Sequence, residues 1–247
     1  MELTQIINLF LIAIIVICVW QGYKKGIIMG IIQVLVIILS LYGAQLLSDT
    51  FSYEVIPVLR PFVSGFMEAR VRQTTYEVFG YEPDENGNYN VTISVSDMMD
   101  SQPENADVIA LKSFQSLGLY DDMARSMADR TLKHAEEANA SLMSSVVTVL
   151  CQAVTWYLGF LLAFFILFSV MTVIVNIPNL SFRIPYVGIV NDIGGAAIGL
   201  VVGCIFCALL VWIVQFAGLL LSEDTVRSTG VAAYFLEQNY LADYITF

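Results

Sequence analysis

Four long uncharged stretches of apolar residues set the pattern of this 247-residue chain, and they cover about residues 3–20, 27–47, 146–175 and 193–221. A helix needs about 20 apolar residues to cross a bilayer core of ~30 Å. In lipid the backbone polar groups must bond to one another, so only helices and closed barrels cross a membrane. Barrel strands alternate apolar and polar residues, and these long runs do not, so they are expected to be helices. The pattern therefore predicts an all-α polytopic membrane protein with four transmembrane helices.

Between the second and third apolar stretches lies a long polar segment, residues 48–144, which holds 16 of the 22 acidic residues. A segment of this length can form a small folded domain. We expect it to be mostly helical, with one helix over residues 62–79 and another over 113–144 that runs on into the third apolar stretch. The alternation of residues 89–95 after Asn86-Gly87 predicts a short strand.

The predicted organisation has four parts: a transmembrane hairpin over residues 1–47, the acidic segment 48–144, a second transmembrane pair over 145–221, and an amphipathic tail over 222–247. The connection 21–26 is so short that the first two spans should form a tight antiparallel hairpin. The tail carries Tyr234, Phe235 and Leu236 in a spacing typical of an interfacial helix.

Basic residues predict the orientation in the membrane. Lys24 and Lys25 lie in the first short connection and Arg183 lies in the other, residues 177–191. Short loops rich in Lys and Arg stay in the cytoplasm. We therefore expect both short loops to be cytoplasmic, and both termini and the acidic segment to be outside. The three basic side chains are also predicted to anchor to lipid head groups.

Small residues recur at four-residue spacing in the last apolar stretch, at Gly195, Gly199 and Gly203, which we call the glycine ladder. This spacing places them on one side of a helix. In lipid, such a row lets a second backbone approach closely and pack by dispersion. A second row of this kind, around the first short connection, consists of Gly22, Gly26 and Gly30. We expect both rows to be helix-packing faces.

Polar side chains in or beside the spans are few. Asn8 lies within the first span, where an interhelical hydrogen bond is favoured over ion binding or proton relay. Asn191 or Asp192 is expected to cap the fourth span, since a side-chain oxygen at that position would accept from free backbone N–H groups.

Groupings of residues that would carry chemistry are scarce. His134 is the single histidine and is expected on a solvated helix surface, and all four cysteines fall in apolar stretches. Cys204 and Cys207 have the spacing of a redox pair, but a position in the middle of a span gives a thiolate nothing to stabilise it. We therefore expect no catalytic residues, no metal or cofactor site and no nucleic-acid binding.

Three motifs carry a family resemblance: Gly22-Tyr23-Lys24-Lys25-Gly26, then Ile184-Pro185-Tyr186-Val187-Gly188-Ile189-Val190-Asn191, and near the end Tyr234-Phe235-Leu236-Glu237-Gln238-Asn239. In this order and topology the chain resembles the colicin V production protein family, in its Gram-positive form with a long extracytoplasmic insertion. Asp192 departs from the family pattern, which often has a basic residue there. The resemblance implies a bacterial inner-membrane protein connected with toxin export or cell-envelope maintenance.

Three functional interpretations follow. The first is a non-enzymatic scaffold or assembly factor, whose partners would be membrane lipids and envelope proteins or further copies of itself. The second is a small oligomeric channel lined by the Gly/Ala face of the fourth span. A membrane enzyme is the third. Ion-coupled transport is disfavoured, because no Asp, Glu, Lys or Arg lies within a predicted span.

Overall fold

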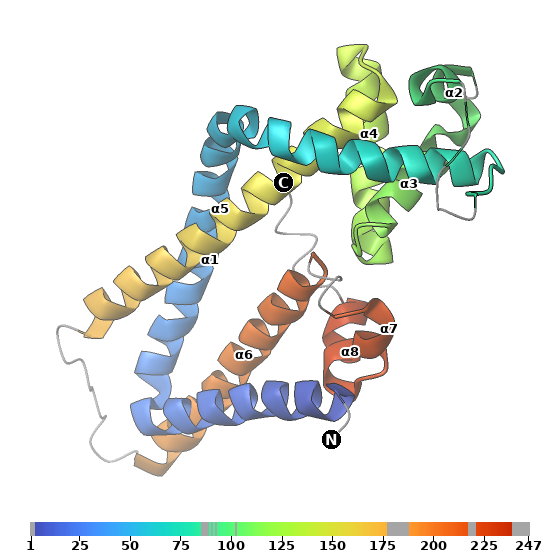
Figure 1. The fold of residues 1–247 in the computed structure, drawn as a ribbon. Coiled ribbons are helices and arrows are strands. Elements are labelled where there is room, and N and C mark those ends of the chain that lie inside the picture. The colour runs from blue at the N-terminus through green and yellow to red at the C-terminus, as the bar shows by residue number, and fades with distance from the viewer. Residues whose placement is uncertain are drawn as a thin grey trace. The chain divides into compact units, whose positions relative to one another are not determined.

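The structure is a computed structural model that describes residues 3–84, 89, 91, 93–101, 103–176, 188–216 and 221–238. Every regular element in these ranges is a helix, so the predicted all-α class is confirmed (Figure 1). The elements are α1 (Leu3–Val78), α2 (Val95–Ser101), the 3₁₀ helix η1 (Pro103–Asn105), α3 (Ala106–Gln115), α4 (Asp121–Ala138), α5 (Leu142–Asn176), α6 (Gly188–Val214), α7 (Glu223–Arg227) and α8 (Gly230–Gln238).

Three helical segments of the described chain are long and apolar enough to cross a membrane: Leu3–Ser52 of α1, the whole of α5, and α6. The sequence predicts four such segments. The difference arises in α1, where the first two predicted spans belong to one helix that is interrupted at a single residue.

That residue is Gly26, whose backbone is non-helical with φ 79° and ψ 177°. A positive φ of this size suits glycine, which has no Cβ to collide with its own backbone. Gly26 divides the apolar part of α1 into a first arm, residues 3–25, and a second arm, residues 27–50. Instead of the expected tight antiparallel hairpin, the two arms diverge from the kink (Figure 1).

The chain forms two compact units. We call Met1–Thr50, Tyr157–Val214 and Leu221–Phe247 the apolar unit, and Phe51–Trp156 with Gln215–Leu220 the acidic unit. The helices α1 and α5 each contribute residues to both units. The boundary in α1 falls close to Ser48, where the composition of the sequence changes.

The acidic unit has a core of its own, formed by fully buried side chains of α1, α3, α4 and α5: Met67, Val71, Ile109, Phe114, Met127 and Val146. Only part of the apolar face predicted over residues 62–79 enters this core, because Phe62 and Phe66 are exposed. The predicted strand is wrong for the described residues: Tyr89 and Val91 lie outside any regular element, and α2 begins at Val95.

The predicted continuous helix from residue 113 into the third span is also wrong. It is divided at Gln115 and again at Asn139, which ends α4 in the left-handed conformation with φ 48°. Asparagine tolerates this conformation better than most residues, because its short amide side chain can hydrogen-bond locally. The backbone N–H groups after the break bond back to the last turn of α4, and α5 starts afresh at Leu142.

The break at Asn139 can be tested by substitution. We expect Asn139→Ala to lower stability by about 1 kcal/mol, because alanine resists the left-handed conformation, and Asn139→Gly to be neutral or mildly stabilising. In a continuous helix the order would reverse, since alanine is the better helix former by up to ~1 kcal/mol. Thermal unfolding midpoints of the full chain in detergent, read for both variants, decide between the two.

Candidate functional site

The glycine ladder of α6 packs directly against the backbone of the first arm of α1. A Cβ built at Gly199 would overlap the carbonyl oxygen of Cys18 and lie 3.0 Å from the Cα atom of Val19. At Gly203 the same atom would lie 3.0 Å from the Cα of Ile15. The two helices therefore touch through main-chain atoms, which is possible only where side chains are absent.

The same contact continues in both directions along the helices. At one end a Cβ on Gly195 would overlap the carbonyl oxygen of Gly22. At the other end the buried Cys207 thiol donates to the carbonyl oxygen of Leu11 at 3.6 Å. Residue numbers fall along one helix as they rise along the other, so the first arm and α6 are antiparallel. Gly30, on the second arm, faces the side chain of Ile198 instead of a backbone.

A second polar contact fixes the kink at Gly26. The Asn191 side-chain oxygen accepts from the backbone N–H of Ile27, the first residue of the second arm, at 3.1 Å. A Cβ on Gly26 would collide with the Asn191 amide. The expectation that Asn191 or Asp192 caps its own helix is corrected, because α6 begins at Gly188 and both residues lie inside it. Asn191 instead caps the second arm of α1 across the interface.

Asn8 makes the same kind of contact at the far end of the first arm. Its side-chain oxygen accepts from the backbone N–H of Val231, at the start of α8, at 3.0 Å. This is the interhelical hydrogen bond predicted for Asn8. The helix α8 buries Ala232, Phe235 and Leu236 and leaves Tyr234 exposed. The first part of the tail thus packs on protein, whereas the tail beyond residue 238 lies outside the described residues.

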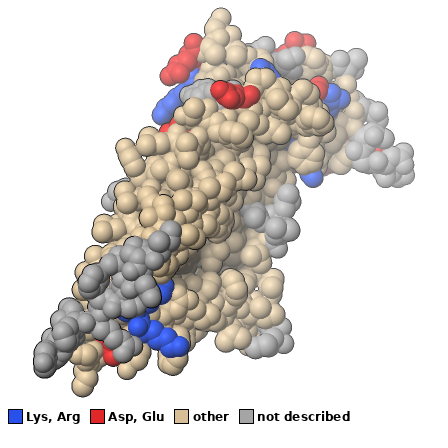
Figure 2. Space-filling view, turned by 90° about the vertical axis from the view of Figure 1, so that its left-hand side faces the viewer, with Lys and Arg blue, Asp and Glu red and all other residues tan. Residues whose placement is uncertain are grey.

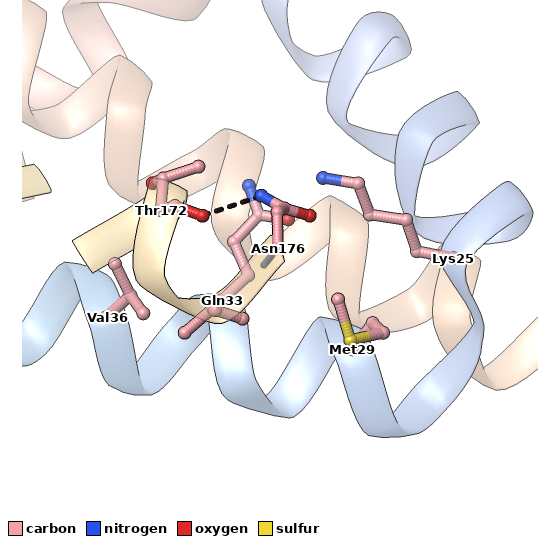
Figure 3. Close-up of a pocket in the computed structure, with 7 residues that line it drawn as sticks. Lys25, Met29, Gln33, Val36, Thr172 and Asn176 are labelled. Carbon is pink, nitrogen blue, oxygen red and sulfur yellow. Dashed lines mark hydrogen bonds between the residues drawn. The ribbon is translucent and has the colours of Figure 1, made fainter. Parts of the chain in front are cut away.

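The two neighbouring lysines have different surroundings. The Lys24 ammonium lies 4.7 Å from the centroid of the Trp20 ring, a cation–π contact. Lys25 lines a small pocket of about 20 Å³ between the second arm and the end of α5 (Figure 3). Arg183, the third predicted head-group anchor, lies outside the described residues.

Four of the seven side chains that line this pocket are polar, although its walls are segments of candidate membrane spans. Figure 3 shows the Lys25 ammonium reaching toward the amide groups of Gln33 and Asn176. Asn176 donates from Nδ2 to the carbonyl oxygen of Thr172 at 2.7 Å. Met29, Val36 and Val175 complete the lining. Sequence reasoning missed the grouping, because Gln33 and Asn176 are far apart in the chain and only packing brings them together.

A larger, partly open cavity of about 260 Å³ in the apolar unit has apolar side chains as its described lining, from the first arm, α6, Leu221, α7 and α8. Its lining includes Ile6, Phe10, Val211, Val226 and Ala232. Apolar side chains of this kind offer no group for chemistry.

Titratable groups that could carry out chemistry do not gather in the described part of the chain, where no set of three or more His, Cys, Asp or Glu residues has metal-binding geometry. His134 departs from the expected solvated position: it is partly buried, and its Nδ1 lies 3.2 Å from the Ser145 hydroxyl. All four cysteines are free thiols. In Figure 2 the charged side chains form small groups, and most of the other described residues in view are uncharged.

Comparisons with protein-family models, with curated proteins and with solved structures find no match to this chain.

The close backbone contact at the glycine ladder predicts that a Gly→Ala substitution lowers stability at one glycine and raises it at another. We expect Gly199→Ala to destabilise the protein by about 1–3 kcal/mol, because its methyl meets backbone atoms that cannot rotate away. Gly65→Ala, within α1 and with nothing within 4 Å of the new Cβ, should stabilise by up to ~1 kcal/mol. Thermal unfolding in detergent measures both. If Gly199→Ala proves as harmless as Val201→Leu, at a position that is 51% exposed, the backbone contact is not tight.

Proposed function

We propose that this protein is a non-enzymatic scaffold or assembly factor of a bacterial inner membrane, of the colicin V production kind, acting in toxin export or cell-envelope maintenance. Its helices would hold the acidic unit at the membrane surface, where that unit meets envelope proteins or further copies of the chain. The motifs around Gly22–Gly26, Ile184–Asn191 and Tyr234–Asn239 support the family assignment.

The observation that carries the scaffold proposal is the backbone contact between α6 and the first arm. Main-chain packing over several helical turns, closed at the kink by Asn191 and at the tail by Asn8, makes a rigid base. Both α1 and α5 then continue from this base into the acidic unit. A fixed base joined to a folded polar unit by continuous helices suits a protein that positions partners.

The same contact disfavours the alternative proposal, a channel lined by the Gly/Ala face of α6. Gly195, Gly199 and Gly203 are covered by the first arm within a single copy of the chain. To line a pore, this face would have to release the first arm and lose the dispersion contacts that hold it. In lipid there is little hydrophobic driving force to offset that loss.

We further propose that the two arms of α1 cross the membrane separately, which gives four crossings with α5 and α6. Each arm is longer than the roughly 20 residues that a crossing requires. The basic residues Lys24 and Lys25 at the kink would then face the cytoplasm, and the acidic unit and both termini would lie outside.

Cysteine labelling in intact cells tests this topology. In a variant whose four native cysteines are replaced by alanine, single cysteines at Ser94 and Ser222 should react with an impermeant maleimide from outside. A cysteine at Tyr23, which is 48% exposed, should react only after the membrane is permeabilised. Reaction at position 23 in intact cells would invert the proposed orientation.

Photo-crosslinking tests the scaffold proposal. The crosslinkable residue benzoylphenylalanine replaces Phe62, which is 77% exposed in the acidic unit, and a matched variant carries it at Leu39, which is 54% exposed in a candidate span. A scaffold should give discrete protein adducts from position 62 and none from position 39. Gly199→Leu should lower abundance and adduct yield together, because partners are lost only with the fold.

The competing channel proposal makes a different prediction for the same proteins. Purified protein would conduct ions in a planar bilayer, and Gly199→Leu would change the conductance while abundance held. Conductance of this kind, together with no discrete adduct at position 62, would contradict the scaffold proposal.

A further inference from the structure

Two polar side chains of the small pocket are left without partners. Among the described residues, neither the Lys25 ammonium nor the half-buried Gln33 amide has a hydrogen-bond or ion-pair partner. Both belong to a helix that is apolar enough to cross a membrane. Lys25 is exposed and Gln33 is half-buried, so both can be reached from outside the protein, and a polar ligand that pairs with them beside an apolar span would be stabilised.

We infer that the pocket formed by Lys25, Gln33, Thr172 and Asn176 binds a phosphate group, supplied by the head group of an anionic phospholipid or by phosphate free in solution. The lining offers one full positive charge and amide and hydroxyl groups that can donate hydrogen bonds. No Asp or Glu is among the described residues that line it. This combination selects an oxyanion, because a cation would be repelled by Lys25.

The size of the pocket defines how the phosphate enters. A volume of about 20 Å³ accommodates one water molecule or one oxygen atom, since a site of roughly 10–15 Å³ already holds a water. One phosphate oxygen therefore fits between Lys25 and the two amides, and the rest of the group stays at the mouth. A charge-assisted hydrogen bond from the ammonium to that oxygen is the strongest contact available.

The surface around the pocket favours the lipid source. Leu39 on the second arm and Val173 on α5 are each more than half exposed, and each lies three residues from a lining residue, Val36 and Asn176, on the same side of its helix. They lie within one or two helical turns of the polar lining. A phospholipid whose phosphate enters the pocket could lay its acyl chains along these side chains, an interaction that free phosphate lacks.

The proposal differs from general anchoring by snorkelling lysines, in which Lys24 and Lys25 would contribute about equally. In the structure Lys24 lies over the Trp20 ring, and only Lys25 lines the pocket. Two adjacent lysines that carry the same charge therefore provide a matched pair, since substituting either one removes one positive charge at nearly the same membrane depth.

The experiment measures bound lipid on full-length protein in nanodiscs that contain phosphatidylglycerol and phosphatidylcholine, by native mass spectrometry after release. We expect Lys25→Gln to weaken phosphatidylglycerol binding about tenfold, the effect of one lost charge-assisted hydrogen bond. Lys24→Gln should change it less than about twofold, because the Lys24 ammonium lies over the Trp20 ring and not in the pocket. Lys25→Arg should restore most of the binding, because it returns the charge.

Gln33→Leu gives an independent variant that leaves the charge unchanged and replaces a polar group by an apolar one. It should reduce phosphatidylglycerol binding with no loss of thermal stability. A purely electrostatic surface would not respond to it. The outcome therefore remains decisive even if Lys25→Gln fails to fold.

A second arm of the experiment separates the two sources of phosphate. Delipidated protein in neutral detergent is titrated with inorganic phosphate by calorimetry. Phosphate binding that Lys25→Gln abolishes, with no selectivity for phosphatidylglycerol, identifies the free ion, whereas selectivity for phosphatidylglycerol without phosphate binding identifies the lipid. Equal effects of Lys24→Gln and Lys25→Gln, or no effect of Gln33→Leu, would overturn the proposed site.

Discussion

The structure of the apolar unit depends on contact between two main chains, those of α6 and of the first arm of α1. In lipid, apolar side chains gain little by leaving the hydrocarbon, so close packing must supply what the hydrophobic effect supplies in water. The absence of side chains at Gly195, Gly199 and Gly203 allows that packing, since any Cβ there would meet backbone atoms or a side chain at close range. The bulky residues on the other sides of α6 remain free to face lipid or neighbouring helices.

Two asparagines then fix the ends of this interface, and each works across helices. Asn191 accepts from the N–H of Ile27 just after the kink, and Asn8 accepts from the N–H of Val231 at the start of α8. A helix start leaves backbone N–H groups without partners inside the helix, and in a dry environment these are costly. Each asparagine satisfies such a group on another segment. The kink at Gly26 and the docked tail thereby become parts of the packed unit.

The polar side chains of the small pocket lie on both sides of the kink and at the end of α5. Lys25 precedes Gly26, Gln33 follows on the second arm, and the end of α5 brings Asn176 beside them. All of these residues belong to the apolar unit, so the pocket, the kink and the backbone contact with α6 are features of one packed unit.

The sequence by itself determined the all-α class, the positions of the apolar segments and the small-residue face of α6, because composition and four-residue spacing are local properties that any helix must express. It could not determine that the first two spans diverge from a single glycine, since the connection 21–26 is equally compatible with a hairpin and with a kink. Nor could it place Asn191: its oxygen has potential partners on its own helix and on another, and only packing at Gly26 decides between them. The same holds for Asn139, where helix propensity favours continuation and the left-handed backbone breaks it. The small pocket could not be predicted for the same physical reason, because Gln33 and Asn176 become neighbours only when the second arm packs against α5.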